Sequence, residues 1–440
     1  MRVRIEDVLT VTMKNKKEID FFSILIENGK ISCLSKKGLK KKPGDLVING
    51  RDKIALPGLI NSHIHSDITL ARGLGDGLTL YEQDYNSLIS RKRWFREELD
   101  SEARQHSRLL QFIEAVKGGT TFICDVPFWW YGDDLISAFR DVGITGAVVL
   151  DYRKDFSTGE RVQRGHYFKT AELLRENGIL PIVEAPAEEH FEKGLLQKLA
   201  MWAEELDTLM QLHLAETTWR MEIIKKRFNS TSVKYLKEIG VLNERLIGSH
   251  GVYLNEEDIN ILKECGARIV NCPVAEMKIA DGIAPVPKLI TRTVPLGLGT
   301  DGALWNDSSD IFSEMKSLML VQRVTNGVSA LSAWDALYAA TRGGAAVFNL
   351  EGELGSIEKG KRAHIILIDT RKPHLTPIHH GKTSNVLQLI TSCAKASDVD
   401  TVIIDGKIIV MGGKIQTVDE QEIINKCIEK SKERFKNTTK

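Results

Sequence analysis

The chain has 440 residues, enough for two or three folding units or for one large barrel with additions. Its 60 basic and 59 acidic side chains leave a formal net charge of +1, which argues against nucleic acid or an anionic membrane as a partner. Charges interrupt the N-terminal stretch, and no apolar run approaches the roughly 18 residues of a membrane span, so we expect a cytoplasmic protein without a signal peptide.

Both ends of the chain predict short strands. The stretch "FFSILIENGKISCLS" turns at Asn28 and Gly29, and "TVIIDGKIIVMGGKI" near the other end turns at Asp405 and Gly406, which are hairpin signals. We therefore expect residues 1–56 and 356–440 to pair into one small β-sandwich domain built from both termini. The final twenty or so residues predict a solvated helix that ends in a charged tail.

Between these ends, short apolar runs alternate with helical patterns. The eight runs are residues 54–65, 120–126, 144–152, 179–186, 209–216, 245–254, 267–274 and 293–302. A helix is expected from Ser101, as its cap, to a glycine pair, and another from Asn255 to Gly266. This alternation predicts a parallel sheet closed into a (β/α)₈ TIM-like barrel over residues 57–355. An open doubly wound sheet is the alternative, but no glycine fingerprint for a dinucleotide follows the first run.

Polar side chains gather at the ends of four of these runs. They are His63, His65, His213, Glu216, His250 and Asp301. An H-x-H pair is a weak signal by itself, an isolated buried histidine is more often a core residue, and an aspartate after "LGLGT" could be a helix cap. The active sites of such barrels lie at the carboxyl ends of the strands, so four runs that agree in position and residue type favour one shared site.

These residue types suit a hydrolytic metal centre. Three imidazoles and a carboxylate are typical ligands of Zn²⁺ or another borderline divalent ion, whereas the six cysteines are widely spaced and predict reduced thiols. Such an ion lowers the pKa of a bound water toward neutrality and generates hydroxide. Glu216 could shuttle protons, Asp301 could accept the proton of the attacking water, and His250 could orient the hydroxide.

The motifs resemble a known family. The segments "PGLINSHIHSDITLARGLGD", "HLAET", "GSHGVYLNEEDI" and "LGLGTDGALWNDSSDIFSEMKS" are similar to the amidohydrolase superfamily. They are closest to its branch of 5′-methylthioadenosine/S-adenosylhomocysteine deaminases and s-triazine chlorohydrolases. The resemblance covers nearly the whole chain. It implies a distorted (β/α)₈ barrel with a composite β-sandwich, and a homo-oligomer, either a dimer or a tetramer.

The same resemblance implies roles for the six side chains. His63, His65, His213 and Asp301 match the ligands of one Zn²⁺ or Fe²⁺ per subunit. Glu216 matches the proton shuttle, and His250 matches the residue that orients the metal-bound water. Together with Asp301, these two are the catalytic residues that we expect.

Around the expected pocket the sequence departs from the nucleoside deaminases. The departures are Gln83 or Asp84 near an expected tryptophan, Glu97 or Glu98 near an expected ribose-binding glutamate, Ala187 in place of a histidine, and Glu276 in place of an asparagine. The metal ligands are therefore those of the family, while the pocket motifs do not identify the substrate.

Three further features leave alternatives open. Glu184, at the end of the fourth run, could bridge a second metal. The aromatic run Trp129–Tyr131 could stack on a flat ring, or form a plug or a subunit interface. Arg72 and Arg153 could meet an anionic group of the substrate, or form structural ion pairs.

From these observations we expect a metal-dependent aminohydrolase that deaminates an amino-substituted nitrogen heterocycle and releases ammonia. A purine nucleoside or aminopurine is the leading small-molecule substrate class. One alternative is a chlorohydrolase or amidohydrolase acting on an s-triazine or a cyclic amide. The other is a catalytically silent binding scaffold.

Overall fold

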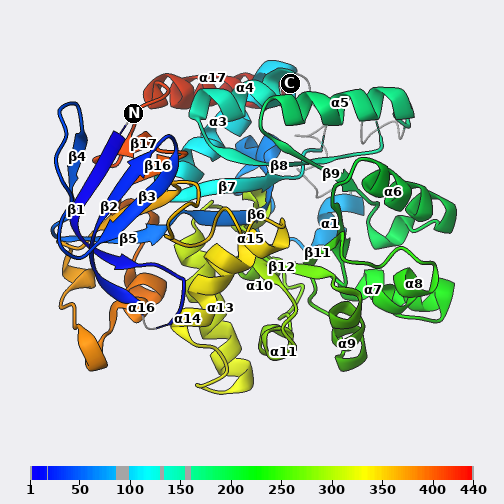
Figure 1. Cartoon of the computed structure of the whole chain (residues 1–440). Coiled ribbons are helices and arrows are strands. Elements are labelled where there is room, and N and C mark those ends of the chain that lie inside the picture. Colours follow the sequence, from blue (N-terminus) through cyan, green and yellow to red (C-terminus); the bar gives the residue numbers. More distant parts are fainter. Residues whose placement is uncertain (1, 17, 86–98, 129–132, 154–159, 439–440) are drawn as a thin grey trace.

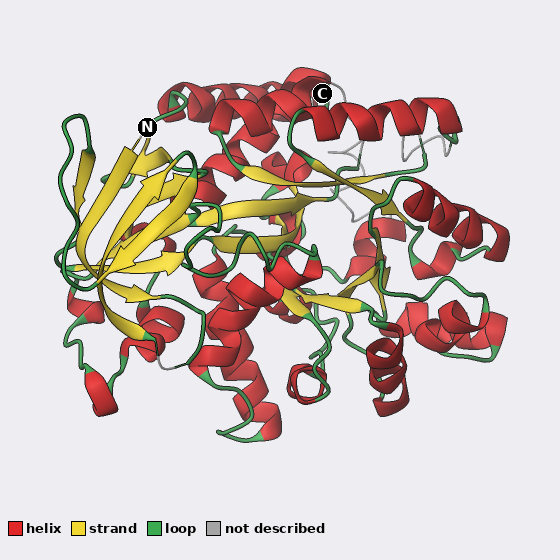
Figure 2. Cartoon of the chain, in the orientation of Figure 1, coloured by secondary structure: helices red, strands yellow, loops and turns green. Residues whose placement is uncertain are grey.

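Two nine-stranded sheets divide the chain between its ends and its middle (Figure 1). The computed structural model describes residues 2–16, 18–85, 99–128, 133–153 and 160–438. Strands from both chain ends form one sheet at one side of the molecule, and the other sheet lies among the helices (Figure 2). We call the first the terminal sheet and the second the barrel sheet.

The terminal sheet is mixed and joins the two ends of the chain. Its strands are β1 (Arg2–Val11), β2 (Ile19–Glu27), β3 (Lys30–Ser35), β4 (Leu46–Asn49), β5 (Lys53–Pro57), β15 (Ile365–Asp369), β16 (Val399–Ile404), β17 (Lys407–Met411) and β18 (Lys414–Ile415). The link between the N-terminal and C-terminal strands is the antiparallel pairing of β5 with β15. The predicted pairing of strands from both termini is confirmed.

Both predicted hairpins are present. The central residues of the β2–β3 turn, Asn28 and Gly29, have φ angles of 51° and 77°. Those of the β16–β17 turn, Asp405 and Gly406, have φ angles of 49° and 74°. Left-handed backbone at both central positions matches the twist of the flanking strands, which is why Asn-Gly and Asp-Gly are favoured there.

An ion pair at the second hairpin predicts a pH-dependent contribution to stability. Arg362 donates two hydrogen bonds to Asp405, at 2.7 and 2.8 Å, and His364 Nε2 lies 3.3 Å from the same carboxylate. Burial alone would raise the pKa of Asp405, but Arg362 and His364 hold it well below its usual range. The stabilisation is therefore present above the unfolded-state pKa of about 3.9 and is lost as the pH falls through the lower folded-state pKa.

We expect Asp405→Asn to lower the free energy of unfolding by about 1 kcal/mol at pH 7. Asparagine tolerates the left-handed backbone, so the change isolates the charge. Thermal unfolding of both proteins should show the difference shrinking as the pH is lowered below about 4, because unfolding of the wild-type protein then takes up a proton at this carboxylate and unfolding of the variant does not. Asp7→Asn is the control, since Asp7 is also left-handed and is 62% exposed. A difference that does not change with pH would contradict the assignment.

The barrel sheet is parallel throughout. Its strands are β6 (Leu59–His65), β7 (Thr120–Asp125), β8 (Thr145–Leu150), β9 (Leu180–Glu184), β10 (Met210–Leu214), β11 (Leu246–His250), β12 (Arg268–Asn271), β13 (Leu296–Leu298) and β14 (Asp301–Gly302). The order starts at β13 and ends at β14, and only residues 299–300 separate these two in the chain. The eighth strand is thus in two parts that close the sheet, which confirms the predicted (β/α)₈ barrel.

The seam of the barrel is tightly packed. A Cβ atom on Gly299 would lie 2.9 Å from the backbone nitrogen of His63, so only glycine fits there. Across the seam, Asn61 Nδ2 donates to Thr300 Oγ1 at 2.8 Å, and the Thr300 N–H donates to Asn61 Oδ1 at 3.0 Å. These contacts fix His63 relative to Asp301.

The first predicted run, residues 54–65, is two strands rather than one. Its first part is β5 of the terminal sheet, and its second part is β6 of the barrel. Gly58 separates them, and a Cβ atom at Gly58 would lie 2.1 Å from Thr121 Oγ1. Both strands are buried, so the apolar pattern runs on without a break. The hydrophobicity of the sequence therefore does not indicate where the chain passes from one sheet to the other.

Helices follow the barrel strands and lie outside them (Figure 2). The α-helices are α1 (Leu80–Tyr85), α3 (Ser101–Lys117), α4 (Asp133–Val142), α5 (Arg164–Glu176), α6 (Lys193–Glu205), α7 (Thr218–Phe228), α8 (Ser232–Glu238), α9 (Glu256–Cys265), α10 (Pro273–Lys278), α11 (Val286–Thr291), α12 (Ala303–Asn306), α13 (Ile311–Asn326), α14 (Ala333–Tyr338), α15 (Gly344–Val347), α16 (Val386–Gln388) and α17 (Glu420–Thr438). Short 3₁₀ or π segments are η1 (Ser66–Ala71), η2 (Glu188–His190), η3 (Ala339–Gly343), η4 (Pro373–Leu375), η5 (Gly381–Thr383), η6 (Leu389–Cys393) and η7 (Ala396–Asp398).

Three predicted helix features can be compared with the structure. Asn255 caps α9 as expected, and Gly266 ends it with a φ of 71°. The cap of α3 is Asp100, not Ser101, because the Asp100 carboxylate accepts from the Ala103 N–H at 2.7 Å. The terminal helix α17 is not simply solvated, since Ile423 and Cys427 are buried. No helix within the described ranges combines the length and apolar character needed to cross a bilayer.

Candidate metal centre

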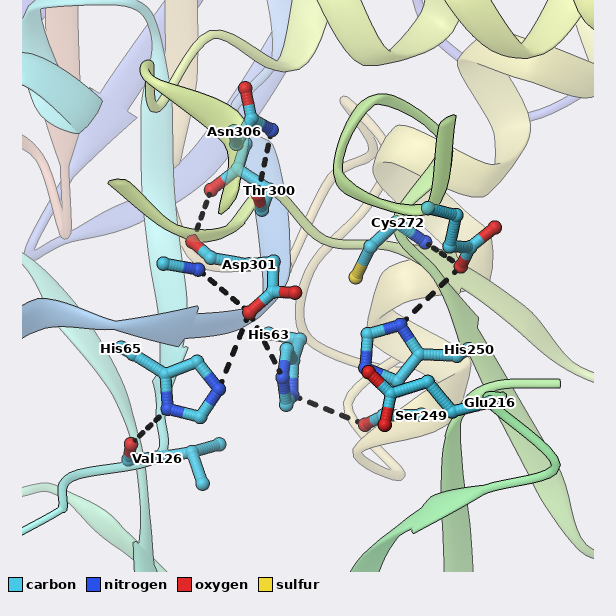
Figure 3. Close-up of polar contacts among 12 residues, drawn as sticks. His63, His65, Val126, Glu216, Ser249, His250, Cys272, Thr300, Asp301 and Asn306 are labelled. Atoms are coloured by element: carbon cyan, nitrogen blue, oxygen red, sulfur yellow. Dashed lines mark hydrogen bonds and ion pairs between the residues drawn. The ribbon is translucent and has the colours of Figure 1, made fainter. Parts of the chain in front are cut away.

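The four predicted ligands come from three places in the barrel. His63 and His65 end β6 and lie on the same face of it, as the alternation of a strand requires, while His213 lies on β10 and Asp301 on β14. His65 Nε2 lies 3.3 Å from Asp301 Oδ1, and His63 Nε2 lies 3.8 Å from the same oxygen (Figure 3). The ring centroids of His63 and His213 are 5.1 Å apart. The structure therefore brings the four side chains together.

A second contact orients each histidine of β6. His65 Nδ1 donates to the carbonyl oxygen of Val126 at 2.6 Å, and His63 Nδ1 lies 3.1 Å from Ser249 Oγ (Figure 3). A carbonyl oxygen can only accept, so the proton of His65 is on Nδ1 and its Nε2 is left as a ligand atom facing Asp301. Contacts of this kind fix the tautomer and the ring orientation of metal-binding histidines.

The donor atoms fit a divalent metal ion. Candidate ligand atoms lie within 4.8 Å of one another in two overlapping groups, which are His63, His65 and His213, and His63, His250 and Asp301. In the described part of the chain, buried His63 Nε2 has no hydrogen-bond partner. Burial, together with neighbouring histidines, lowers the pKa of both His63 and His213 well below the usual range, so both imidazoles are neutral and can bind metal.

The two other predicted residues, Glu216 and His250, lie beside this cluster. His250 ends β11, and its Nε2 lies 3.5 Å from Glu216 Oε1 (Figure 3). Its Nδ1 lies 3.5 Å from Glu276 Oε1. Burial alone would lower the pKa of His250, but these two carboxylates and Asp301 raise it to about 10. The His250 ring is thus a hydrogen-bond donor at neutral pH.

Three residues near the ends of barrel strands have left-handed backbone, which sets the direction of their side chains. Ala215, His250 and Asp301 have φ angles of 49°, 76° and 62°. This region is unfavourable for residues other than glycine, and such residues gather at functional sites where the surrounding structure holds them. Ala215 directly follows β10, His250 ends β11, and Asp301 begins the second part of the eighth strand, β14.

Glu276 is held firmly against His250. Its carboxylate accepts from Asn271 Nδ2 at 2.6 and 2.8 Å and from the Cys272 N–H at 2.9 Å. Glu276 lies on the short helix α10 and is buried. The glutamate that replaces the asparagine expected from the resemblance is therefore part of this site.

An ion-pair network that was not predicted from the sequence lies behind Glu216. Arg220, on α7, donates to Glu216, and its Nε lies 2.7 Å from Glu189 Oε2. All three side chains are largely buried. A glutamate and an arginine four residues apart at the start of a helix are a recognisable signal for the first of these contacts. Nothing local in the sequence indicates Glu189.

A cavity opens beside the metal cluster. His65, His213, Glu216 and Asp301 line it, and so do Asp84, Arg153, Glu184 and Ala187. Two aromatic side chains also line it: the Phe128 ring stacks on His65 at 4.8 Å, and the Trp305 ring meets His65 edge-on at 5.2 Å. Phe128 and Trp305 were not among the predicted residues. They form an apolar wall next to the predicted ligand His65.

Other predicted pocket residues lie elsewhere. Gln83 is buried and donates to the Leu78 carbonyl at 3.0 Å, and Arg72 pairs with Glu114. The run Trp129–Tyr131, Glu97 and Glu98 lie outside the described residues. The flat-ring role proposed for the aromatic run therefore stays a prediction.

Comparison with known proteins gives consistent results over the whole chain. The Amidohydrolase family matches residues 54–409. The chain is 35% identical to a 5′-deoxyadenosine deaminase of Methanobrevibacter smithii, covering 100% of this chain and 99% of that one. It is 33% identical to a 5-methylthioadenosine/S-adenosylhomocysteine deaminase of Dictyoglomus turgidum, covering 96% and 97%.

Solved structures agree in fold. An adenosine deaminase from Xanthomonas campestris with bound zinc superimposes with a TM-score of 0.90 at 25% identity, covering 99% of this chain and 98% of the other. A zinc complex of atrazine chlorohydrolase from Arthrobacter aurescens TC1 gives 0.86 at 20% identity, covering 98% and 100%, and shows the fold alone. The histidine–aspartate cluster and the zinc-bound neighbour support a divalent metal at this site. With the family match over most of its length and relatives above 30% identity end to end, the chain belongs to the amidohydrolase family.

Proposed function

We propose that this chain is a zinc-dependent aminohydrolase that removes the amino group of an adenosine-type nucleoside as ammonia. The observation that carries the proposal is the pair Glu216 and His250, 3.5 Å apart and buried beside the four metal-binding side chains. Further support comes from the relatives, which are named as deaminases of 5′-deoxyadenosine, 5-methylthioadenosine and S-adenosylhomocysteine.

In this proposal His63, His65, His213 and Asp301 hold the ion, which supplies the Lewis acidity that lowers the pKa of a water molecule toward neutrality. Glu216 is close to the cluster without being one of these four ligands. Its carboxyl group can carry a proton to a ring nitrogen of the base, and can later pass a proton to the departing amine.

The remaining residues position the reactants. His250 donates a hydrogen bond toward the attacking oxygen, and the Asp301 carboxylate can accept a proton from it. The rings of Phe128 and Trp305 provide an apolar surface against which a flat base can pack. Arg220 and Glu189 hold the Glu216 carboxylate from behind.

An ammonia-release assay tests the function directly. Zinc-loaded protein should release ammonia from adenosine, 5′-deoxyadenosine and 5′-methylthioadenosine, and should leave the corresponding 6-oxo product. Cytidine, a pterin, atrazine and a cyclic amide serve as comparison compounds. Release of chloride from atrazine in place of ammonia would favour the chlorohydrolase, and a new carboxylate from a cyclic amide would favour the amidohydrolase. Full zinc occupancy without any turnover would favour a binding scaffold.

Glu276 offers a test of the way in which His250 is held. We expect Glu276→Gln to lower kcat roughly 10-fold with unchanged zinc content, because the neutral amide no longer pairs with the ring of His250. Glu257→Gln, an exposed substitution on α9, is the control. Steady-state kinetics and metal analysis of both variants are the measurements. An unchanged kcat for Glu276→Gln would show that this contact does not matter for turnover.

The family resemblance also supports a homo-oligomer, a dimer or a tetramer. Light scattering of the purified protein during size-exclusion chromatography measures the mass directly, and a monomer would contradict the proposal.

A further inference from the structure

Both arginines among the described residues that line the cavity are paired with carboxylates. Arg153 Nε lies 2.9 Å from Asp151 Oδ1, and its Nη2 lies 2.6 Å from Asp151 Oδ2, in a two-point ion pair. Arg220 is held by Glu216 and Glu189. Among the described residues that line the cavity, Arg153 and Arg220 are the only arginines or lysines. To pair with either of these two described arginines, an anionic group of a substrate would have to displace one of their carboxylates.

Glu184 differs from the other carboxylates of the cavity. It lines the cavity and is 9% exposed, and its buried Oε2 has no hydrogen-bond partner within the described part of the chain. Burial and the neighbouring Asp151 raise the pKa of Glu184 well above its usual range. A buried carboxylate oxygen without a donor is unfavourable, so a ligand that brings a donor would stabilise the ionised form of Glu184 and lower its pKa.

The place of Glu184 in the barrel separates it from the reacting centre. It ends β9 and pairs in register with Gln211, two residues before the metal-cluster residue His213 on β10. The strand order β8-β9-β10-β11 puts His250, on β11, on the far side of β10. Asp151 and Arg153 follow β8, so Glu184 and this ion pair form one side of the cavity. A substrate whose base reaches Glu216 and His250 would meet Glu184 with another part.

We propose that Glu184 accepts a hydrogen bond from a hydroxyl or ammonium group on the sugar side of the substrate. The cavity then selects nucleosides that are neutral or cationic at this end over those that carry a phosphate or a carboxylate. The inference rests on the proposed deaminase function and adds the substrate class. A charged hydrogen bond of this kind corresponds to about a 10- to 100-fold difference in affinity or in kcat/KM.

The test uses zinc-loaded protein and three probes with the same base. They are adenosine, 5′-amino-5′-deoxyadenosine and adenosine 5′-monophosphate, which carry a hydroxyl, an ammonium and a phosphate at the same position. The wild-type protein should deaminate the first two with a kcat/KM at least about 10-fold above that of the monophosphate. Glu184→Gln should lose most of that selectivity and retain the zinc and the melting temperature. Glu176→Gln, exposed at the end of α5, is the matched control.

Each outcome of this experiment either supports or overturns the proposed role of Glu184. A wild-type preference for the monophosphate, or selectivity that is unchanged in Glu184→Gln, overturns the inference and leaves the deaminase function intact. Two zinc ions per chain that fall to one in Glu184→Gln would assign Glu184 to a second metal and also overturn it.

If no probe is deaminated, the proposed function fails. Calorimetric binding of the three probes to the Glu216→Gln variant then still decides the selectivity: tighter binding of the amine than of the monophosphate supports it, and equal, reversed or absent binding overturns it.

Discussion

Replacing Glu216 with glutamine is expected to lower turnover about 10²- to 10⁴-fold while the metal content stays at one ion per chain. Glutamine has nearly the same shape, but its amide cannot take up and release a proton near neutral pH. His63, His65, His213 and Asp301 are unchanged in this variant, so the metal should remain. Single-turnover ammonia release and metal analysis of the same preparation measure both quantities.

The effect must be distinguished from damage to the fold. Arg220 loses its contact with Glu216 in this variant but keeps Glu189, so we expect only a small change in melting temperature. Glu222→Gln changes an exposed glutamate of the same helix, α7, and should leave turnover unchanged. Wild-type turnover in Glu216→Gln would refute the proton-shuttle role. A loss of zinc in that variant would instead make Glu216 a ligand.

The second large effect is expected at Asp301. Asp301→Asn should weaken metal binding by at least the roughly 10- to 100-fold seen when a supporting contact of a metal site is removed, and turnover should fall with occupancy. Asparagine tolerates the left-handed backbone of this position, where φ is 62°, so the carboxylate charge is the main change. The measurements are zinc per chain after dialysis against a competing chelator, and the recovery of activity at raised zinc concentration.

Asp307→Asn is the matched control for this substitution. Asp307 also has left-handed backbone, with φ of 75°, but it lies at the end of α12 and is 49% exposed. Within the described part of the chain its carboxylate pairs with Lys278, away from the four proposed ligands, so its loss should leave zinc binding unchanged. If Asp301→Asn retained zinc as tightly as the control does, Asp301 would not be a ligand.

Much of the fold follows from local patterns in the sequence. The period of two along a strand places His63 and His65 on one face, and Asn28–Gly29 and Asp405–Gly406 form the turns that their residue types favour. The rule that barrel sites lie at the carboxyl ends of strands brings His213, His250 and Asp301 to the same end. The wrong predictions concern the boundaries of helices and strands, where a single residue decides the position of the boundary. Asp100 replaces Ser101 as a cap, and Gly58 divides a continuous apolar run between two sheets.

By itself, the sequence determined the barrel, the terminal sheet and the residue types of the metal cluster, because each depends on short-range periodicity or on the position of a residue within its own strand. Only the tertiary structure decided which charged side chains form ion pairs. Asp151 pairs with Arg153, Glu189 and Glu216 share Arg220, and one oxygen of Glu184 has no hydrogen-bond partner among the residues that the structure describes. Most of these contacts join different strands and loops, so their partners are set by packing around the barrel and by the backbone turns at the strand ends. That is why the chemistry could be predicted from the sequence, while the selectivity of the cavity could be inferred only from the structure.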